Sequence, residues 1–128
     1  INDTEGEYKT SYFDGCVSYN VLVTRFDDTE EDQEYLNVSN GNMISVKCMT
    51  ENQATEIVDF IKNIKVDENT EIIIHCTAGQ NRSASVGKFC VDYFGYDMNK
   101  FKQDNPRAKG NSTVSRLLNN KFYWKHYN

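Results

Sequence analysis

The feature that most constrains the fold is a strand-like run, a short polar loop and a helical pattern that follow one another within residues 70–94. The run Thr70–His75 reads TEIIIH, and its β-branched apolar residues predict a buried strand. Beyond the loop, Arg82–Phe94 reads RSASVGKFCVDYF and has apolar residues at helical spacing. The sequence therefore predicts that Cys76 leaves a strand and that Arg82 begins a helix.

The loop from Cys76 to Arg82 has the components of a phosphate-binding site. Backbone N–H groups at the start of a helix lack partners within the helix, and the macrodipole adds positive charge there. Gly79 can adopt a positive φ, which lets successive N–H groups point inward. The planar guanidinium of Arg82 can bind two phosphate oxygens at once. The same surroundings are expected to lower the pKa of Cys76 and so favour the nucleophilic thiolate.

The stretch His75–Ser83, HCTAGQNRS, resembles the signature HC-x5-R-[ST] of the cysteine-dependent protein tyrosine phosphatase superfamily, in its small dual-specificity branch. The segment beginning at Asn111, NSTVSRLL, resembles the closing helix of that family. The resemblance implies a phosphatase that hydrolyses phosphotyrosine, and also phosphoserine or phosphothreonine, through a phosphocysteine intermediate. It implies a phosphorylated protein as the partner, with no cofactor and no metal.

The resemblance also implies roles for individual residues. Cys76 would attack phosphorus, and Ser83 would donate a hydrogen bond to the departing thiolate. His75 would orient the loop, although a structural histidine explains it equally well. The phosphate oxygens would be held by the residues that follow the cysteine, namely Thr77, Ala78, Gly79, Gln80, Asn81 and Arg82.

The general acid is where the sequence departs from the family pattern. In the family, an aspartate follows the strand that precedes the helix before the signature, but here that region reads VKCMTEN and has no aspartate. Glu51 is the acid in this region, and a helix-start role also explains it. Asp28 and its neighbour Asp27, which follow an earlier strand, are the other candidates. Arg107 matches the position of a basic residue with which relatives contact a second phosphate, and Lys109 is an alternative.

Two other functions are also compatible with the sequence. An RNA 5′-triphosphatase of the same superfamily would suit the Asn81–Arg82 pair and the missing aspartate, because a polyphosphate leaving group needs protonation less. The net charge of −5 counts against an RNA partner. A catalytically weak phosphate-binding module, a pseudophosphatase, is the other alternative.

Composition favours one compact domain over residues 1–128. No stretch approaches the ~20 apolar residues that cross a bilayer, so we expect no membrane partner. The four cysteines have no spacing typical of a disulfide scaffold, which favours a reducing, cytoplasmic location. We expect a monomer. Charge is uneven, because residues 98–128 carry seven Lys or Arg and one acid.

The remaining patterns predict alternating strands and helices. Strands are expected at Cys16–Phe26, Met43–Cys48 and Thr70–His75, with an acidic loop at Asp27–Glu34. Helices are expected at Glu51–Lys65, Arg82–Phe94, Met98–Gln103 and Ser112–Tyr127. The expected fold class is therefore α/β, with a mostly parallel central sheet flanked by helices. The loop from Cys76 to Arg82, which we call the phosphate loop, is expected at the carboxyl end of a strand.

Overall fold

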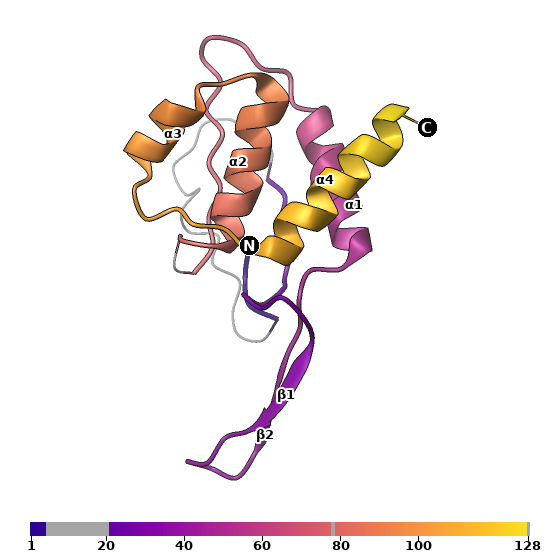
Figure 1. The fold of residues 1–128 in the computed structure, drawn as a ribbon, viewed down its shortest axis with the longest axis vertical. Coiled ribbons are helices and arrows are strands. Elements are labelled where there is room, and N and C mark those ends of the chain that lie inside the picture. Colours follow the sequence, from indigo (N-terminus) through magenta and orange to yellow (C-terminus); the bar gives the residue numbers. More distant parts are fainter. Residues whose placement is uncertain (5–20, 78, 128) are drawn as a thin grey trace.

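The computed structural model describes residues 1–4, 21–77 and 79–127, with side chains described as far as residue 122. Its elements are two strands and four helices, shown in Figure 1. In chain order they are β1 (Gln33–Leu36), β2 (Met43–Val46), α1 (Glu51–Lys62), α2 (Arg82–Phe94), α3 (Met98–Asp104) and α4 (Ser112–Tyr127). None of these helices is both long enough and apolar enough to cross a bilayer.

Helix α1 begins where its sequence predicts. Thr50 accepts a hydrogen bond from the backbone of Gln53, and the Gln53 side chain accepts one from the backbone of Thr50, which makes a capping box. The helix buries one apolar face that includes Ala54 and Val58. It ends at Lys62 rather than Lys65, and Asn63 is its C-cap, whose N–H donates to carbonyls of the last turn.

Helices α2 and α4 have the bounds that the sequence predicts. Helix α2 ends at Phe94, and its C-cap Gly95 has a φ of 72°, a left-handed conformation that suits a glycine. Helix α4 is capped by Asn111, whose side-chain oxygen accepts from the N–H groups of Thr113 and Val114. Helix α3 extends one residue further than predicted, to Asp104.

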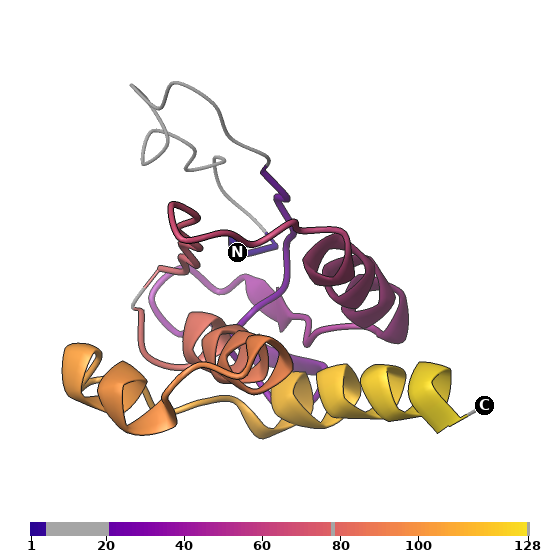
Figure 2. The same ribbon diagram turned by 90° about the horizontal axis from the view of Figure 1, so that it is seen from above.

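The core lies where α1, α2 and α4 meet. Helix α4 packs against both α1 and α2, and α3 packs against α2. In Figure 2, α3, α2 and α4 form one layer. The extended chain that precedes the phosphate loop crosses above this layer in that view. The largest fully buried apolar side chains of the core are Phe26, Met49, Val58, Val114 and Leu118.

The predicted parallel central sheet is wrong. The sheet found in the described residues is the two-stranded antiparallel pair of β1 and β2, with Gln33 opposite Val46 and Leu36 opposite Met43. This hairpin projects from the helical body in Figure 1. Strand β1 begins inside the segment that the sequence assigned to an acidic loop, whereas β2 falls within the predicted strand Met43–Cys48.

The other two predicted strands do not form a ladder. Of Cys16–Phe26, residues 16–20 lie outside the described residues, and residues 21–26 contribute one isolated parallel bridge, between Arg25 and Asn2. Thr70–His75 is not assigned to a strand. Residues 1 and 2 bond to both segments: Asn2 pairs with the backbone at 24 and 26, and Ile1 donates to the carbonyl of His75. A β-branched apolar run predicts an extended, partly buried chain, but a strand also needs a neighbour in register.

Candidate phosphate-binding site

The thiol of Cys76 lies at the centre of the candidate site. The residue is 3% exposed. Its Sγ accepts a hydrogen bond from the N–H of Gly79 at 3.3 Å and from the N–H of Ser83 at 3.5 Å. The hydroxyl of Ser83 is 3.2 Å from the same sulfur, and it donates once the thiol has ionised. The loop therefore directs three donor groups at one sulfur atom.

Gly79 gives the loop its turn. Its φ of 68° is the left-handed conformation expected from the sequence, and a side chain there would be strained although nothing lies nearby to obstruct it. With this backbone its N–H points at the sulfur. Ala78, which was also predicted to bind phosphate, lies outside the described residues.

The pKa of Cys76 is lowered from its ordinary value by a balance of opposing effects. Burial is the largest single influence, and by itself it would raise the pKa. The hydroxyl and N–H of Ser83, the N–H of Gly79 and the charge of Arg82 all favour the thiolate, and together they outweigh burial. The other described cysteines behave differently, because burial raises the pKa of Cys48 and raises that of Cys90 to about 12. Cys76 is thus the described thiol best suited to act as a nucleophile.

Arg82 is the first residue of α2, and one nitrogen of its side chain, Nη1, bonds to two acceptors. It is 5% exposed, and its Nη1 donates to the carbonyl oxygen of Phe26 at 2.8 Å. The same nitrogen donates to Oδ1 of Asp3 at 2.7 Å, which makes an ion pair. Nothing in the sequence identifies Asp3, which lies 79 positions before Arg82 and has no motif around it.

The remaining loop residues are held by neighbouring segments. Thr77 donates from its hydroxyl to Oδ1 of Asp3 over a long 3.5 Å. The carbonyl of Gln80 accepts from the N–H of Lys109 at 2.7 Å. The side-chain amide of Asn81 donates to Oδ2 of Asp28 at 2.7 Å. The loop is therefore tied to Asp3, to the loop before α4 and to the acidic segment.

Asp28 is the candidate acid that the structure brings to the phosphate loop. Besides Asn81, it accepts from the side-chain amide of Asn111 at 2.9 Å through its other oxygen. Asn111 is 5% exposed and also caps α4, so one buried side chain joins the acidic segment to the closing helix. The sequence offered Asn111 only as part of a family resemblance, without this bridging role.

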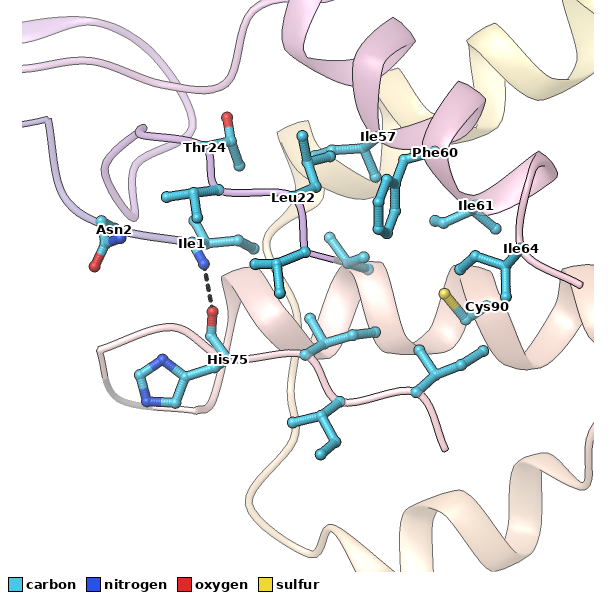
Figure 3. A pocket seen from close by; sticks show the side chains of 16 residues that line it. Ile1, Asn2, Leu22, Thr24, Ile57, Phe60, Ile61, Ile64, His75 and Cys90 are labelled. Carbon is cyan, nitrogen blue, oxygen red and sulfur yellow. Dashed lines mark hydrogen bonds between the residues drawn. The ribbon is translucent and has the colours of Figure 1, made fainter. Parts of the chain in front are cut away.

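Three other predicted residues lie differently. Glu51 stands in the first turn of α1 and pairs with Lys121 of α4 at 3.8 Å, not with a residue of the phosphate loop. Arg107 is exposed, and no hydrogen bond or ion pair joins it to the described loop residues, so second-phosphate binding by it stays a prediction. His75 contributes its carbonyl oxygen as acceptor for Ile1, and Figure 3 shows its ring turned away from the apolar side chains nearby.

An apolar cavity of about 120 Å³ lies behind the loop. Residues 21–24, residues 72–74 and α1 contribute to its lining, and Figure 3 labels Leu22, Phe60 and Ile61 among the side chains that line it. Cys90 of α2 also lines this cavity, whereas Cys76 and Arg82 do not. The cavity is thus separate from the thiol, and half of its lining residues belong to two segments that the sequence predicted as strands, Cys16–Phe26 and Thr70–His75.

Comparisons with family models, with curated proteins and with solved structures found no match for this chain. In the described part of the chain, no group of three or more His, Cys, Asp and Glu side chains is arranged to hold a metal ion. The functional proposal therefore depends on the chemistry of the phosphate loop itself.

Proposed function

We propose that this protein is a cysteine-dependent phosphatase of the dual-specificity type, which hydrolyses phosphate monoesters on proteins. The observation that carries the proposal is the convergence of Gly79 N–H, Ser83 N–H and the Ser83 hydroxyl on the sulfur of Cys76. Such a cluster, at the start of a helix and beside a buried arginine, favours the thiolate over the thiol and supports the binding of a phosphoryl group.

In the proposed reaction, the Cys76 thiolate attacks phosphorus and forms an S–P bond while the bond from phosphorus to the substrate oxygen breaks. The leaving oxygen takes a proton, and water then cleaves the phosphocysteine to give phosphate and the thiolate. Ser83 stabilises the thiolate as it leaves, because its hydroxyl is already 3.2 Å from the sulfur. Arg82 and the loop N–H groups would stabilise the charge on the transferring phosphoryl group.

Asp28 is our candidate for the proton donor. It contacts loop residue Asn81, whereas the alternative acid, Glu51, pairs with Lys121 of α4. A lost general acid typically costs 10²–10⁴-fold in rate when the leaving group is poor. An aryl phosphate with a good leaving group needs little protonation, so its hydrolysis reports on the loop alone.

The test is hydrolysis of such an aryl phosphate by the wild type and by Cys76→Ser, Asp28→Asn and Glu51→Gln. A phosphotyrosine peptide and a 5′-triphosphate RNA are assayed in parallel. We expect Cys76→Ser to abolish turnover on every substrate, and Asp28→Asn to slow hydrolysis of the peptide but not of the aryl phosphate. Glu51→Gln is the matched control, because it removes a carboxylate that does not contact the loop.

Turnover confined to the RNA would contradict the protein-phosphatase assignment and favour the triphosphatase. Turnover that survives in Cys76→Ser would overturn the cysteine mechanism altogether. Absence of turnover on all substrates, together with binding of inorganic phosphate, would make the protein a phosphate-binding module.

A further inference from the structure

Residues 1–4, which we call the strap, run alongside the phosphate loop. The N–H of Asn2 donates to the carbonyl of Thr24 at 2.9 Å, and the N–H of Phe26 donates to the carbonyl of Asn2 at 3.0 Å. On the other side, the backbone nitrogen of Ile1 donates to the carbonyl of His75 at 2.6 Å, as Figure 3 shows. The strap is therefore bonded both to residues 24–26 and to the residue that precedes Cys76.

A carboxylate of the strap contacts the side chains expected to bind phosphate. Oδ1 of Asp3 is 2.7 Å from Nη1 of Arg82 and 3.5 Å from the hydroxyl of Thr77. The Arg82 side chain is 5% exposed and that of Asp3 is 50% exposed. An anion thus already binds the arginine from the solvent side, which is where an incoming phosphoryl group would approach.

The strap is anchored beyond Asp3 as well. Thr4 donates to both carboxylate oxygens of Asp27, from its N–H at 3.0 Å and from its hydroxyl at 2.7 Å. Arg25 donates through Nη1 to the carbonyl oxygens of Asp3 and Thr4, at 3.1 and 3.3 Å. Because these bonds order the backbone on both sides of Asp3, its carboxylate returns to Arg82 as an intramolecular ligand at high effective concentration.

We propose that Asp3 is an internal ligand of the phosphate loop, which competes with a phosphoryl group for Arg82. The inference rests on the proposed function, since it assumes that the loop binds phosphate. The strap then regulates the site, because the apparent affinity for any anion is reduced by the fraction of molecules in which Asp3 occupies Arg82. Removing the carboxylate removes that reduction and leaves in place the N–H groups of Gly79 and Ser83 that face the Cys76 sulfur.

The test measures binding of inorganic phosphate to the wild type and to Asp3→Asn by titration calorimetry. We expect Asp3→Asn to bind phosphate about tenfold more tightly, which corresponds to about 1.4 kcal/mol. Asp104→Asn is the matched control, since it makes the same change of charge at the end of α3, where the carboxylate pairs with Lys100. Thr4→Val, which removes one anchor of the strap, should tighten binding in the same direction but less.

Steady-state kinetics on the aryl phosphate complete the test. The proposal predicts a KM lowered to the same extent as the Kd for phosphate, with kcat almost unchanged. Equal phosphate affinity in the wild type and Asp3→Asn would overturn it, and so would a lower affinity in the variant. A loss of kcat confined to the phosphotyrosine peptide would overturn it too and make Asp3 a proton donor.

Failure of the proposed function gives a different pattern. If neither protein turns over any substrate but Asp3→Asn still binds phosphate more tightly, the internal-ligand inference stands and the phosphatase assignment falls. If neither protein binds phosphate, the inference is overturned, because the loop is then not an anion site.

Discussion

Replacing Ser83 with alanine tests the electrostatic basis of the site. The substitution removes one of the three donors that face the Cys76 sulfur, the hydroxyl at 3.2 Å, and leaves the N–H groups of Ser83 and Gly79 in place. A hydrogen bond to a charged group contributes about 1.5–3 kcal/mol. We take the lower end because sulfur is a weak acceptor. Since 1.36 kcal/mol is one pKa unit, the Cys76 pKa should rise by about one unit.

The assay follows the ultraviolet absorbance of the thiolate as a function of pH, with the Cys76→Ser protein as the blank. Cys16, which lies outside the described residues, is replaced by serine in every protein. Cys90 does not interfere near neutral pH, because burial raises its pKa to about 12. Ser112→Ala is the control, since Ser112 is exposed and bonds to Glu30 rather than to the loop.

Two results would refute this reasoning. A wild-type thiol that titrates at or above the ordinary value for cysteine would show that burial outweighs the donors. Coincident curves for the wild type and Ser83→Ala would show that the hydroxyl does not stabilise the thiolate, whatever its distance from the sulfur.

Three other substitutions test the fold and the network around the site. Leu118→Ala should lower the free energy of unfolding by about 2–5 kcal/mol, because the Leu118 side chain is fully buried where α4 joins the core. Urea denaturation measures this change. The control Asn119→Ala, at an exposed neighbouring position, should change the free energy of unfolding by less than about 0.5 kcal/mol. Asn111→Ala should lower the free energy of unfolding by about 1–2 kcal/mol, because α4 loses its N-cap. It should also slow hydrolysis of the phosphotyrosine peptide, because Asp28 loses a hydrogen-bond donor. A loss of stability with unchanged turnover would limit the role of Asn111 to capping. Burial would raise the pKa of Asp27, but N–H groups of Lys47 and Thr4, the Thr4 hydroxyl and the charge of Arg82 bring it below its ordinary value of 3.8. Its ionised form therefore adds stability that is complete above pH 3.8 and is lost as the pH falls through the lower folded-state pKa. The unfolding free energy of Asp27→Asn should therefore fall less steeply at acidic pH than that of the wild type. Parallel pH dependences for the two proteins would contradict this.

The sequence predicted the helices well because their signals are local. Apolar spacing and a capping residue lie within each helix or next to it, as Thr50 and Gln53 do for α1. Arg82–Phe94 and Ser112–Tyr127 were predicted with the bounds that the structure has. The grouping of Cys76, Gly79 and Ser83 in one loop could be predicted for the same reason, since these residues lie within eight consecutive positions.

The sheet could not be predicted in this way, because a strand depends on a partner that is distant in the chain. The run Thr70–His75 has strand composition, yet its described backbone bonds to the strap, through Ile1, instead of to a neighbouring ladder. Asp3 was missed for the same reason. Its contact with Arg82 spans 79 positions, and nothing in the residues beside it indicates which cation it meets.

The measurement that tests the central claim most directly is the trapping of a phosphoenzyme. The wild type is mixed with the aryl phosphate, quenched during turnover and analysed by peptide mass spectrometry. The proposed function predicts one phosphoryl group on the peptide that contains Cys76, and none in Cys76→Ser. Turnover without a phosphorylated intermediate, or a phosphoryl group on another residue, would contradict it.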